Sequence, residues 1–224
     1  WRAIRFCLAH KDLFKTQLRA LLRASAWGDL RIMFPMISGL EELEQALAVL
    51  EEAKAECRKK GNTFSADVPV GIMVEVPSAA MTADILAEKS AFFSIGTNDL
   101  VQYAIAADRG NERVAYLAQP FHPAVLRFVK ATIDAAHVKG IPAAMCGELA
   151  GDPHATAILL GLGLDEFSMS APSIPLVKRI VRGTSAAECA ELAENALQLR
   201  SYLDVEALVR SWMIERFPSM KADF

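Results

Sequence analysis

The sequence predicts an α/β fold built on parallel strands. Five short apolar runs, at residues 30–36, 70–76, 91–95, 142–146 and 166–169, alternate with longer segments of helical periodicity. These runs are nearly continuous rather than alternating, as expected for parallel strands covered on both faces. The pattern leaves two architectures open, a doubly wound sheet and a (β/α)8 barrel, because both alternate strand and helix.

The segments between the apolar runs carry readable helix ends. Helices are predicted over 41–60, 123–139, 187–199 and 205–217, with a further helix beginning at Pro153. Ser38-x-x-Glu41 has the pattern of a capping box for the first of these helices. Asp152 before Pro153 places a capping side chain ahead of a proline at the first helical position. No linker or low-complexity segment interrupts the chain, so a single domain over 1–224 is predicted.

The composition indicates a globular protein and argues against nucleic-acid-binding and membrane-spanning classes. With 53% hydrophobic and 23% charged residues in 224, the chain is globular and long enough for a sizeable core. A net charge of −3 and the lack of a long Lys/Arg cluster argue against nucleic-acid binding. The apolar runs are too short or too interrupted to span a bilayer. Four scattered cysteines with no C-x-x-C pair, and no signal peptide, indicate a reduced, cytosolic protein.

Polar side chains follow the apolar runs at the points where the predicted strands end. Glu75 follows the second run, and Asn98 and Asp99 follow the third. Cys146 closes the fourth and is followed by Gly147-Glu148. Both candidate architectures bind their ligands beyond the carboxyl ends of the strands, so we expect these side chains to share one rim.

Glu75 and Asp99 suit a hard divalent cation. Two carboxylates leave several octahedral positions for water and substrate oxygens, which is the usual way that Mg²⁺ is held. The alternative is that each carboxylate caps the helix that follows it. That alternative is stronger for Asp99 than for Glu75, because Pro77 and Ser78 already supply helix-start chemistry after Glu75.

An asparagine and two arginines could contact an anionic substrate, and a cysteine could donate a proton, but each has a structural alternative. Asn98 could donate a hydrogen bond to an anionic oxygen, or it could simply form a turn. Arg109, in Asp108-Arg109-Gly110, could bind a phosphate, or it could be a solvated loop residue. Arg2 has the same two alternatives, phosphate binding or a solvated position, with less local sequence evidence for the first. Cys146 is either a small apolar filler or a proton donor, since thiols are mostly protonated at neutral pH.

Four stretches closely resemble the phosphoenolpyruvate-utilising enzymes. They are GIMVEVPSAA, FFSIGTNDLVQYAIAADRGN, AAMCGELAGDP and GLDEFSMSAPSIP. Within that group they are most similar to the phosphoenolpyruvate–protein phosphotransferases, the Enzyme I family of the bacterial sugar phosphotransferase system. The resemblance covers nearly the whole chain and weakens towards its end. Pyruvate phosphate dikinase and phosphoenolpyruvate synthase share the Gly-Thr-Asn-Asp and Cys-Gly-Glu signatures, so a relative of those enzymes is an alternative.

The resemblance implies a fold and a role for each matching position. The chain would supply the last five βα units of a (β/α)8 TIM-type barrel, plus C-terminal helices. Glu75 and Asp99 would hold Mg²⁺, and Arg2, Asn98 and Arg109 would contact the phosphoryl group of phosphoenolpyruvate. Cys146 would protonate the enolate carbon to give pyruvate.

The resemblance also implies partners. The phosphoryl group would pass to a histidine in a separate N-terminal domain, whose Thr-Cys-Gly-Gly stretch this sequence lacks, and then to the phosphocarrier protein HPr. Family members dimerise through the present domain, so a homodimer is expected. The opening at Trp1 without a Met suggests a piece of a longer protein. A binding or dimerisation module that is inactive alone is therefore a further alternative.

Overall fold

Five parallel strands lie side by side in the order in which they occur along the chain. The computed structural model describes residues 2–219. The strands are β1 (Ile32–Phe34), β2 (Val70–Val74), β3 (Phe93–Gly96), β4 (Ala143–Cys146) and β5 (Glu166–Phe167). Their order in the sheet is β1-β2-β3-β4-β5, and every neighbouring pair is parallel. The prediction of an α/β fold with a parallel sheet is confirmed.

This strand order distinguishes between the two architectures that the pattern left open. A doubly wound sheet reverses its strand order at a switch point, where the helices change face. In the described residues no reversal occurs, so right-handed crossovers place successive helices on the same side of the sheet. The sheet therefore has the topology of five consecutive strands of a (β/α)8 barrel.

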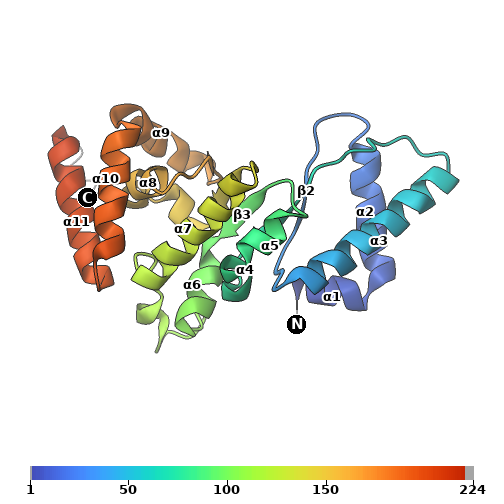
Figure 1. Cartoon of the computed structure of the whole chain (residues 1–224), viewed down its shortest axis with the longest axis horizontal. Coiled ribbons are helices and arrows are strands. Elements are labelled where there is room, and N and C mark those ends of the chain that lie inside the picture. Colours follow the sequence, from blue (N-terminus) through green and yellow to red (C-terminus); the bar gives the residue numbers. More distant parts are fainter. Residues whose placement is uncertain (1, 220–224) are drawn as a thin grey trace.

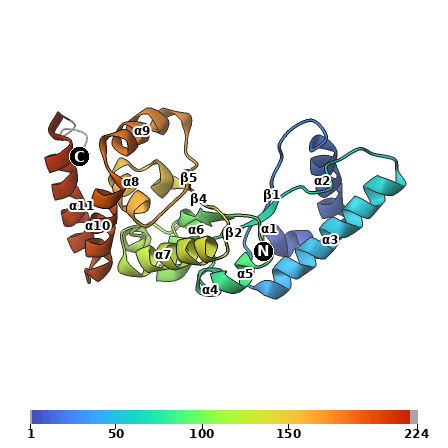
Figure 2. The same ribbon diagram turned by 45° about the horizontal axis from the view of Figure 1, so that its top comes forward.

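Helices surround this sheet on its outer side and extend the molecule at both ends. They are α1 (Ala3–Ala9), α2 (Lys11–Ala24), α3 (Leu40–Lys59), α4 (Pro77–Met81), α5 (Ala83–Ala87), α6 (Thr97–Ile105), α7 (Pro123–Val138), α8 (Pro153–Gly161), α9 (Ile174–Gly183), α10 (Ala186–Gln198) and α11 (Tyr202–Arg216). Short 3-10 turns lie at Ala115–Leu117, Glu148–Gly151 and Ala171–Ser173. In Figure 1, α1–α3 form one end of the elongated molecule and α8–α11 form the other. Figure 2 shows the strands crossing the middle, between these two groups of helices.

The two faces of the sheet have different surroundings. Ile72, Val74, Phe93 and Ile95 are fully buried in the hydrophobic core, which α4, α5 and α7 complete. The alternate residues share the opposite face, because side chains alternate along a strand and the register aligns neighbouring strands. That inner face carries the polar side chains from which the site is built.

The predicted strands and helices agree with the structure to within a few residues, but their ends differ, and α1, α2 and α9 had not been predicted. The strands are shorter than the apolar runs, since the flanking apolar residues lie in the connecting loops. The predicted capping box at Ser38 and Glu41 is wrong. Leu40–Lys59 begins after Gly39, and the backbone N–H of Ser38 donates instead to Glu42 over 2.7 Å.

Side-chain caps do occur at other helix starts, including those of α8 and α10. Asp152 accepts the N–H of His154 over 2.8 Å, as the Asp-Pro pattern predicts. A complete capping box joins Ser185 and Glu188 at the start of α10, which begins at Ala186 rather than at residue 187. Among residues 2–219, we find no helix with the length and apolar character needed to cross a bilayer.

Candidate functional site

The carboxyl ends of the strands bring the predicted site residues to one rim of the sheet. Glu75 directly follows β2, Asp99 lies in the first turn of α6 after β3, and Cys146 ends β4. Because the strands are parallel and adjacent, these positions lie on the same edge. The rim contains two groups of side chains, one around Glu75 and one around Arg109.

Glu75 is a buried carboxylate held by the backbone of the neighbouring strand end. Glu75 is only 4% exposed, and its Oε1 accepts a hydrogen bond from the backbone N–H of Met36 over 2.7 Å. Met36 has a φ of +58°, a left-handed conformation that is uncommon for a residue with a side chain. Such a conformation persists only where surrounding contacts hold it, and here it accompanies the hydrogen bond to Glu75.

The surroundings of Glu75 favour its protonated form. Burial is the main cause and raises its pKa to about 7, with the nearby negative charge of Asp99 acting in the same direction. The N–H of Met36 opposes this shift but does not cancel it. A divalent cation beside Glu75 would favour its charged form, because the positive charge opposes the effects of burial and of the neighbouring Asp99.

Asp99 faces both this carboxylate and an arginine from the start of the chain. The guanidinium of Arg2 donates to Oδ1 of Asp99, and it lies 3.4 Å from the hydroxyl of Tyr103, one turn further along α6. This ion pair raises the pKa of Arg2. Arg2, which had the least local support in the sequence, therefore lies at the same rim as Glu75 and Asp99.

Asn98, next to Asp99 in the chain, forms a hydrogen bond to the segment that follows β4. Its Oδ1 accepts the backbone N–H of Glu148 over 3.2 Å, which leaves the amide nitrogen as the end that can donate to an anion. Gly147 permits this approach. It has a φ of +98°, and a Cβ there would lie 2.6 Å from Oγ1 of Thr97 and 3.0 Å from Oδ1 of Asn98.

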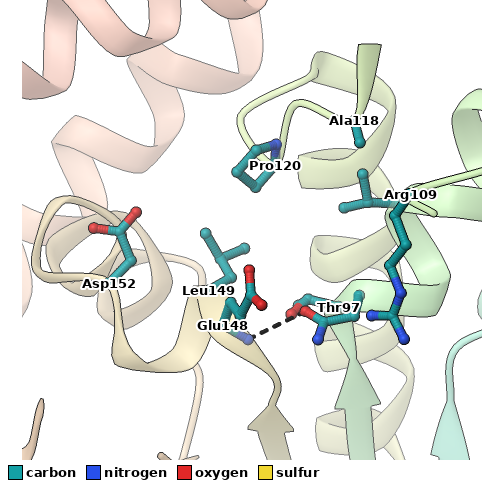
Figure 3. Close-up of a pocket in the computed structure, with 9 residues that line it drawn as sticks. Thr97, Arg109, Ala118, Pro120, Glu148, Leu149 and Asp152 are labelled. Carbon is teal, nitrogen blue, oxygen red and sulfur yellow. Dashed lines mark hydrogen bonds between the residues drawn. The ribbon is translucent and has the colours of Figure 1, made fainter. Parts of the chain in front are cut away.

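Arg109 lines a pocket beside the N-terminus of α6, which we call the Arg109 pocket. It has a volume of about 270 Å³ and is lined in part by Thr97, Asn98, Arg109, Glu148, Leu149 and Asp152. Figure 3 shows the guanidinium of Arg109 extending towards Thr97, while Glu148 and Asp152 lie across the pocket. A helix N-terminus and a guanidinium both attract negative charge, so the side of the pocket formed by Arg109 and the start of α6 suits an anionic group, away from Glu148 and Asp152.

Cys146 lines a second hollow on the other side of Asn98, which we call the Cys146 hollow. It has a volume of about 500 Å³ and is lined in part by Asn98, Cys146, Glu148, Ser168, Ser170 and Ser173. The carbonyl of Cys146 accepts a hydrogen bond from Oγ1 of Thr97 over 3.2 Å. The thiol is partly exposed towards this hollow, and the hydroxyl of Ser94 donates to its sulfur over 3.5 Å.

The structure brings together all six residues proposed from the sequence, in two adjacent groups. Glu75, Asp99 and Arg2 form the first group, and Arg109 lines the pocket of the second. Asn98 lines both this pocket and the Cys146 hollow. Met36 and Ser94 were not predicted as site residues, and Asp152 was predicted only as a helix cap. Ser94 had one available signal, since it is a polar residue inside an otherwise apolar strand.

Comparison with protein families gives one broad match. A family model described as "PEP-utilising enzyme, PEP-binding domain" matches residues 1–186. Among solved structures, a citrate lyase from Burkholderia xenovorans superposes with a TM-score of 0.56 at 19% identity, covering 92% of this chain and 68% of that one. This likeness concerns the fold alone.

Curated relatives are similar over almost the whole chain. Proteins named phosphoenolpyruvate-protein phosphotransferase from Haemophilus influenzae, Staphylococcus carnosus and Priestia megaterium are 50%, 52% and 54% identical over 96%, 95% and 94% of the chain. The matched part is 37% of each relative's own length. The chain thus spans little more than a third of the curated relatives that it matches.

Proposed function

Because this chain belongs to the family of the phosphoenolpyruvate-binding domain of phosphoenolpyruvate-utilising enzymes, we propose that it binds phosphoenolpyruvate within a phosphoenolpyruvate–protein phosphotransferase. Such an enzyme moves the phosphoryl group to one of its own histidines and releases pyruvate. The curated relatives named above all carry the phosphotransferase name, which favours this activity over that of a dikinase or synthase. In this proposal, residues 1–224 are one domain, the later part of the substrate-binding barrel.

Glu75 and Asp99 are the residues that would hold Mg²⁺. Their oxygens are hard donors, they face one another, and burial together with Asp99 disfavours the charged form of Glu75. Among the described residues, no group of three or more His, Cys, Asp and Glu side chains has the arrangement of a metal site. Two carboxylates fit a magnesium ion whose other ligands are waters and substrate oxygens. When bound, the ion would supply positive charge to the phosphate and to the developing enolate.

Arg2, Asn98 and Arg109 would position the phosphoryl group. Phosphoryl transfer asks the protein mainly for positioning and for neutralisation of the equatorial oxygens. Arg109 presents its guanidinium to the pocket beside the N-terminus of α6, and Asn98 adds an amide donor at the same helix end. Arg2 lies beside Asp99 and would add a third contact to the phosphoryl group.

Cys146 would act as the acid that completes the reaction. Transfer of the phosphoryl group leaves an enolate, and protonation of its methylene carbon gives pyruvate. The thiol of Cys146 lines an open hollow next to Asn98, so an enolate beside Asn98 would lie within reach of a proton donor. Glu148 lines both the Arg109 pocket and the Cys146 hollow. Its backbone N–H donates to Asn98 and would hold the amide of Asn98 in place.

The partners of this reaction are part of the same proposal. The acceptor histidine would belong to a separate N-terminal domain, and the phosphoryl group would then pass to HPr for sugar uptake. We also propose a homodimer, as the family resemblance implies, and a cytoplasmic location, which the scattered cysteines favour. The edges of β1 and β5 would be covered by further barrel strands or by a neighbouring chain, since exposed parallel edges promote aggregation.

The closeness of Glu75 and Asp99 at one rim carries this proposal, and metal-dependent ligand binding tests it. In the full-length protein, phosphoenolpyruvate should release heat on binding in the presence of Mg²⁺, and Asp99→Asn should remove most of that heat. Unchanged metal-dependent binding in Asp99→Asn would refute the metal site. The same titration on residues 1–224 measures whether this part of the protein binds phosphoenolpyruvate and Mg²⁺ by itself. Binding by the full-length protein only would mean that other strands are required.

A further inference from the structure

A hydroxyl group lies directly behind the thiol of Cys146. Oγ of Ser94, on β3, donates to Sγ of Cys146, on β4, over 3.5 Å. Ser94 is only 6% exposed, whereas Cys146 is partly exposed and lines the Cys146 hollow. The sulfur therefore has a buried donor on one side and an open cavity on the other.

The sheet register fixes this pair. Ser94 is aligned with Ala144, and Gly96 with Cys146, so the side chains of Ser94 and Cys146 lie on the same inner face, two positions apart. Thr97 holds the carbonyl of Cys146 from the start of α6. Both the backbone and the side chain of Cys146 are thus bonded to the β3–α6 segment.

Stability alone does not explain a serine at this position. Burying a hydroxyl is unfavourable unless it is well hydrogen-bonded, and a neutral thiol is a weak acceptor. An alanine would avoid that unfavourable burial in a strand whose neighbours are apolar. The bond gains strength when the sulfur becomes negative, because hydrogen bonds to charged groups are roughly twice as strong as neutral ones.

We propose that Ser94 is a positioning residue for Cys146, which aims the thiol into the hollow and stabilises the thiolate left by proton transfer. This inference rests on the proposed function. In the step, the S–H bond of Cys146 breaks and its proton forms a C–H bond at the methylene carbon of the enolate. Sulfur keeps the electron pair and accepts the hydrogen bond from Ser94. Water entering the hollow then returns a proton to the thiolate.

Alkylation of Cys146 in the full-length protein tests the hydrogen bond without any need for activity. The thiolate is the species that reacts with iodoacetamide, so its rate of modification at neutral pH reports thiolate stability. Ser94→Ala should slow modification of Cys146 by about three- to tenfold, as expected when a bond to a charged group is lost and nucleophilicity partly compensates. Mass spectrometry of the digested protein assigns the rate to this cysteine.

Two controls separate this effect from a change in packing. Ser94→Thr retains the hydroxyl and should react within about twofold of the wild-type rate, given the small effect expected of a retained donor. Cys7, on α1, serves as an internal reference whose rate should not change. A Ser94→Ala variant that reacts equally fast or faster would overturn the proposal, since a purely spatial role of Ser94 predicts better access to the sulfur.

A kinetic arm separates this inference from the proposed function. With phosphoenolpyruvate, Ser94→Ala should lower the rate of pyruvate release while leaving the Kd for phosphoenolpyruvate within about twofold, because the bond acts on the sulfur and not on the substrate. If Cys146→Ala releases pyruvate at the wild-type rate, the proposed acid role fails, whatever the alkylation result. If Cys146→Ala is slow but Ser94→Ala is not, only the positioning role fails.

Discussion

Gly96 and Glu75 approach so closely that a side chain on residue 96 has no room. A Cβ there would lie 2.9 Å from both Cβ and Oε2 of Glu75, and 3.0 Å from Cγ of Met73. The absence of a side chain at the end of β3 lets the carboxylate from β2 lie across the neighbouring strand. The rim can therefore bring Glu75 next to Asp99, three residues after Gly96.

Gly96→Ala should displace Glu75 and weaken the proposed metal site. We expect a loss of stability of about 1–3 kcal/mol, as for overpacking of a well-packed interior, together with weaker Mg²⁺ binding. Calorimetric titration with Mg²⁺ and thermal unfolding measure the two effects. Gly28→Ala is the matched control, because a Cβ at Gly28 meets nothing within 4 Å, and it should leave both quantities nearly unchanged. Equal behaviour of the two variants would contradict the steric argument.

The raised pKa of Glu75 predicts how the free energy of unfolding depends on pH when a chelator keeps metal ions away from the protein. Its pKa is about 7 in the folded protein, above its value of about 4.5 in the unfolded chain, so the folded state holds the proton more tightly. The resulting stabilisation is complete below about pH 4.5 and is lost as the pH rises through about 7. The loss is on the order of 3 kcal/mol. Thermal unfolding at about pH 5 and about pH 8 measures it.

Glu75→Gln and added Mg²⁺ identify the origin of this pH dependence. The variant cannot ionise at residue 75, so its stability should change less between the two pH values than that of the wild type. Mg²⁺ should stabilise the wild type more at the higher pH, where the carboxylate is charged. A pH profile that is the same for wild type and Glu75→Gln would exclude Glu75 as its source.

Gly147→Ala should disturb Asn98 and reduce the proposed binding of phosphoenolpyruvate. The new Cβ would meet Thr97 and Asn98, and the positive φ adds strain of about 1 kcal/mol or more. Gly61→Ala provides the comparison, since Gly61 has a φ of +67° but open space around its Cβ. Both variants should lose stability. Only Gly147→Ala should also raise the Kd for phosphoenolpyruvate in the presence of Mg²⁺.

Arg109→Ala should weaken phosphoenolpyruvate binding by about 10- to 100-fold, the effect of losing charge-assisted hydrogen bonds to a phosphate. Arg109→Lys should recover only part of this affinity, because an ammonium cannot make the paired contacts of a guanidinium. Arg113→Ala removes the same charge from the same loop outside the Arg109 pocket and should have little effect. Titration calorimetry at constant ionic strength compares the three variants, and similar losses for Arg109→Ala and Arg113→Ala would indicate a non-specific charge effect.

Much of the architecture could be predicted because its signals are local. Continuous apolar runs indicated parallel strands, and Asp152-Pro153 correctly indicated a helix start. The capping box at Ser38 was mispredicted because the helix starts one residue later than the pattern indicates: Gly39 is the N-cap residue, and Glu42 accepts hydrogen bonds from the N–H and hydroxyl of Ser38. The roles assigned to Glu75, Asp99, Cys146 and Arg109 remain predictions, although the structure places all four at one rim.

The sequence by itself determined the α/β class, the polar side chains at the strand ends and the family to which the chain belongs, since each depends on residue types within short stretches. The tertiary structure alone decided the strand order and the contacts between distant segments. Met36 reaches Glu75 across 39 residues, Ser94 reaches Cys146 across 52, and Arg2 reaches Asp99 across 97. No local pattern encodes such contacts, because they depend on which strands become neighbours and on how closely a glycine allows them to approach.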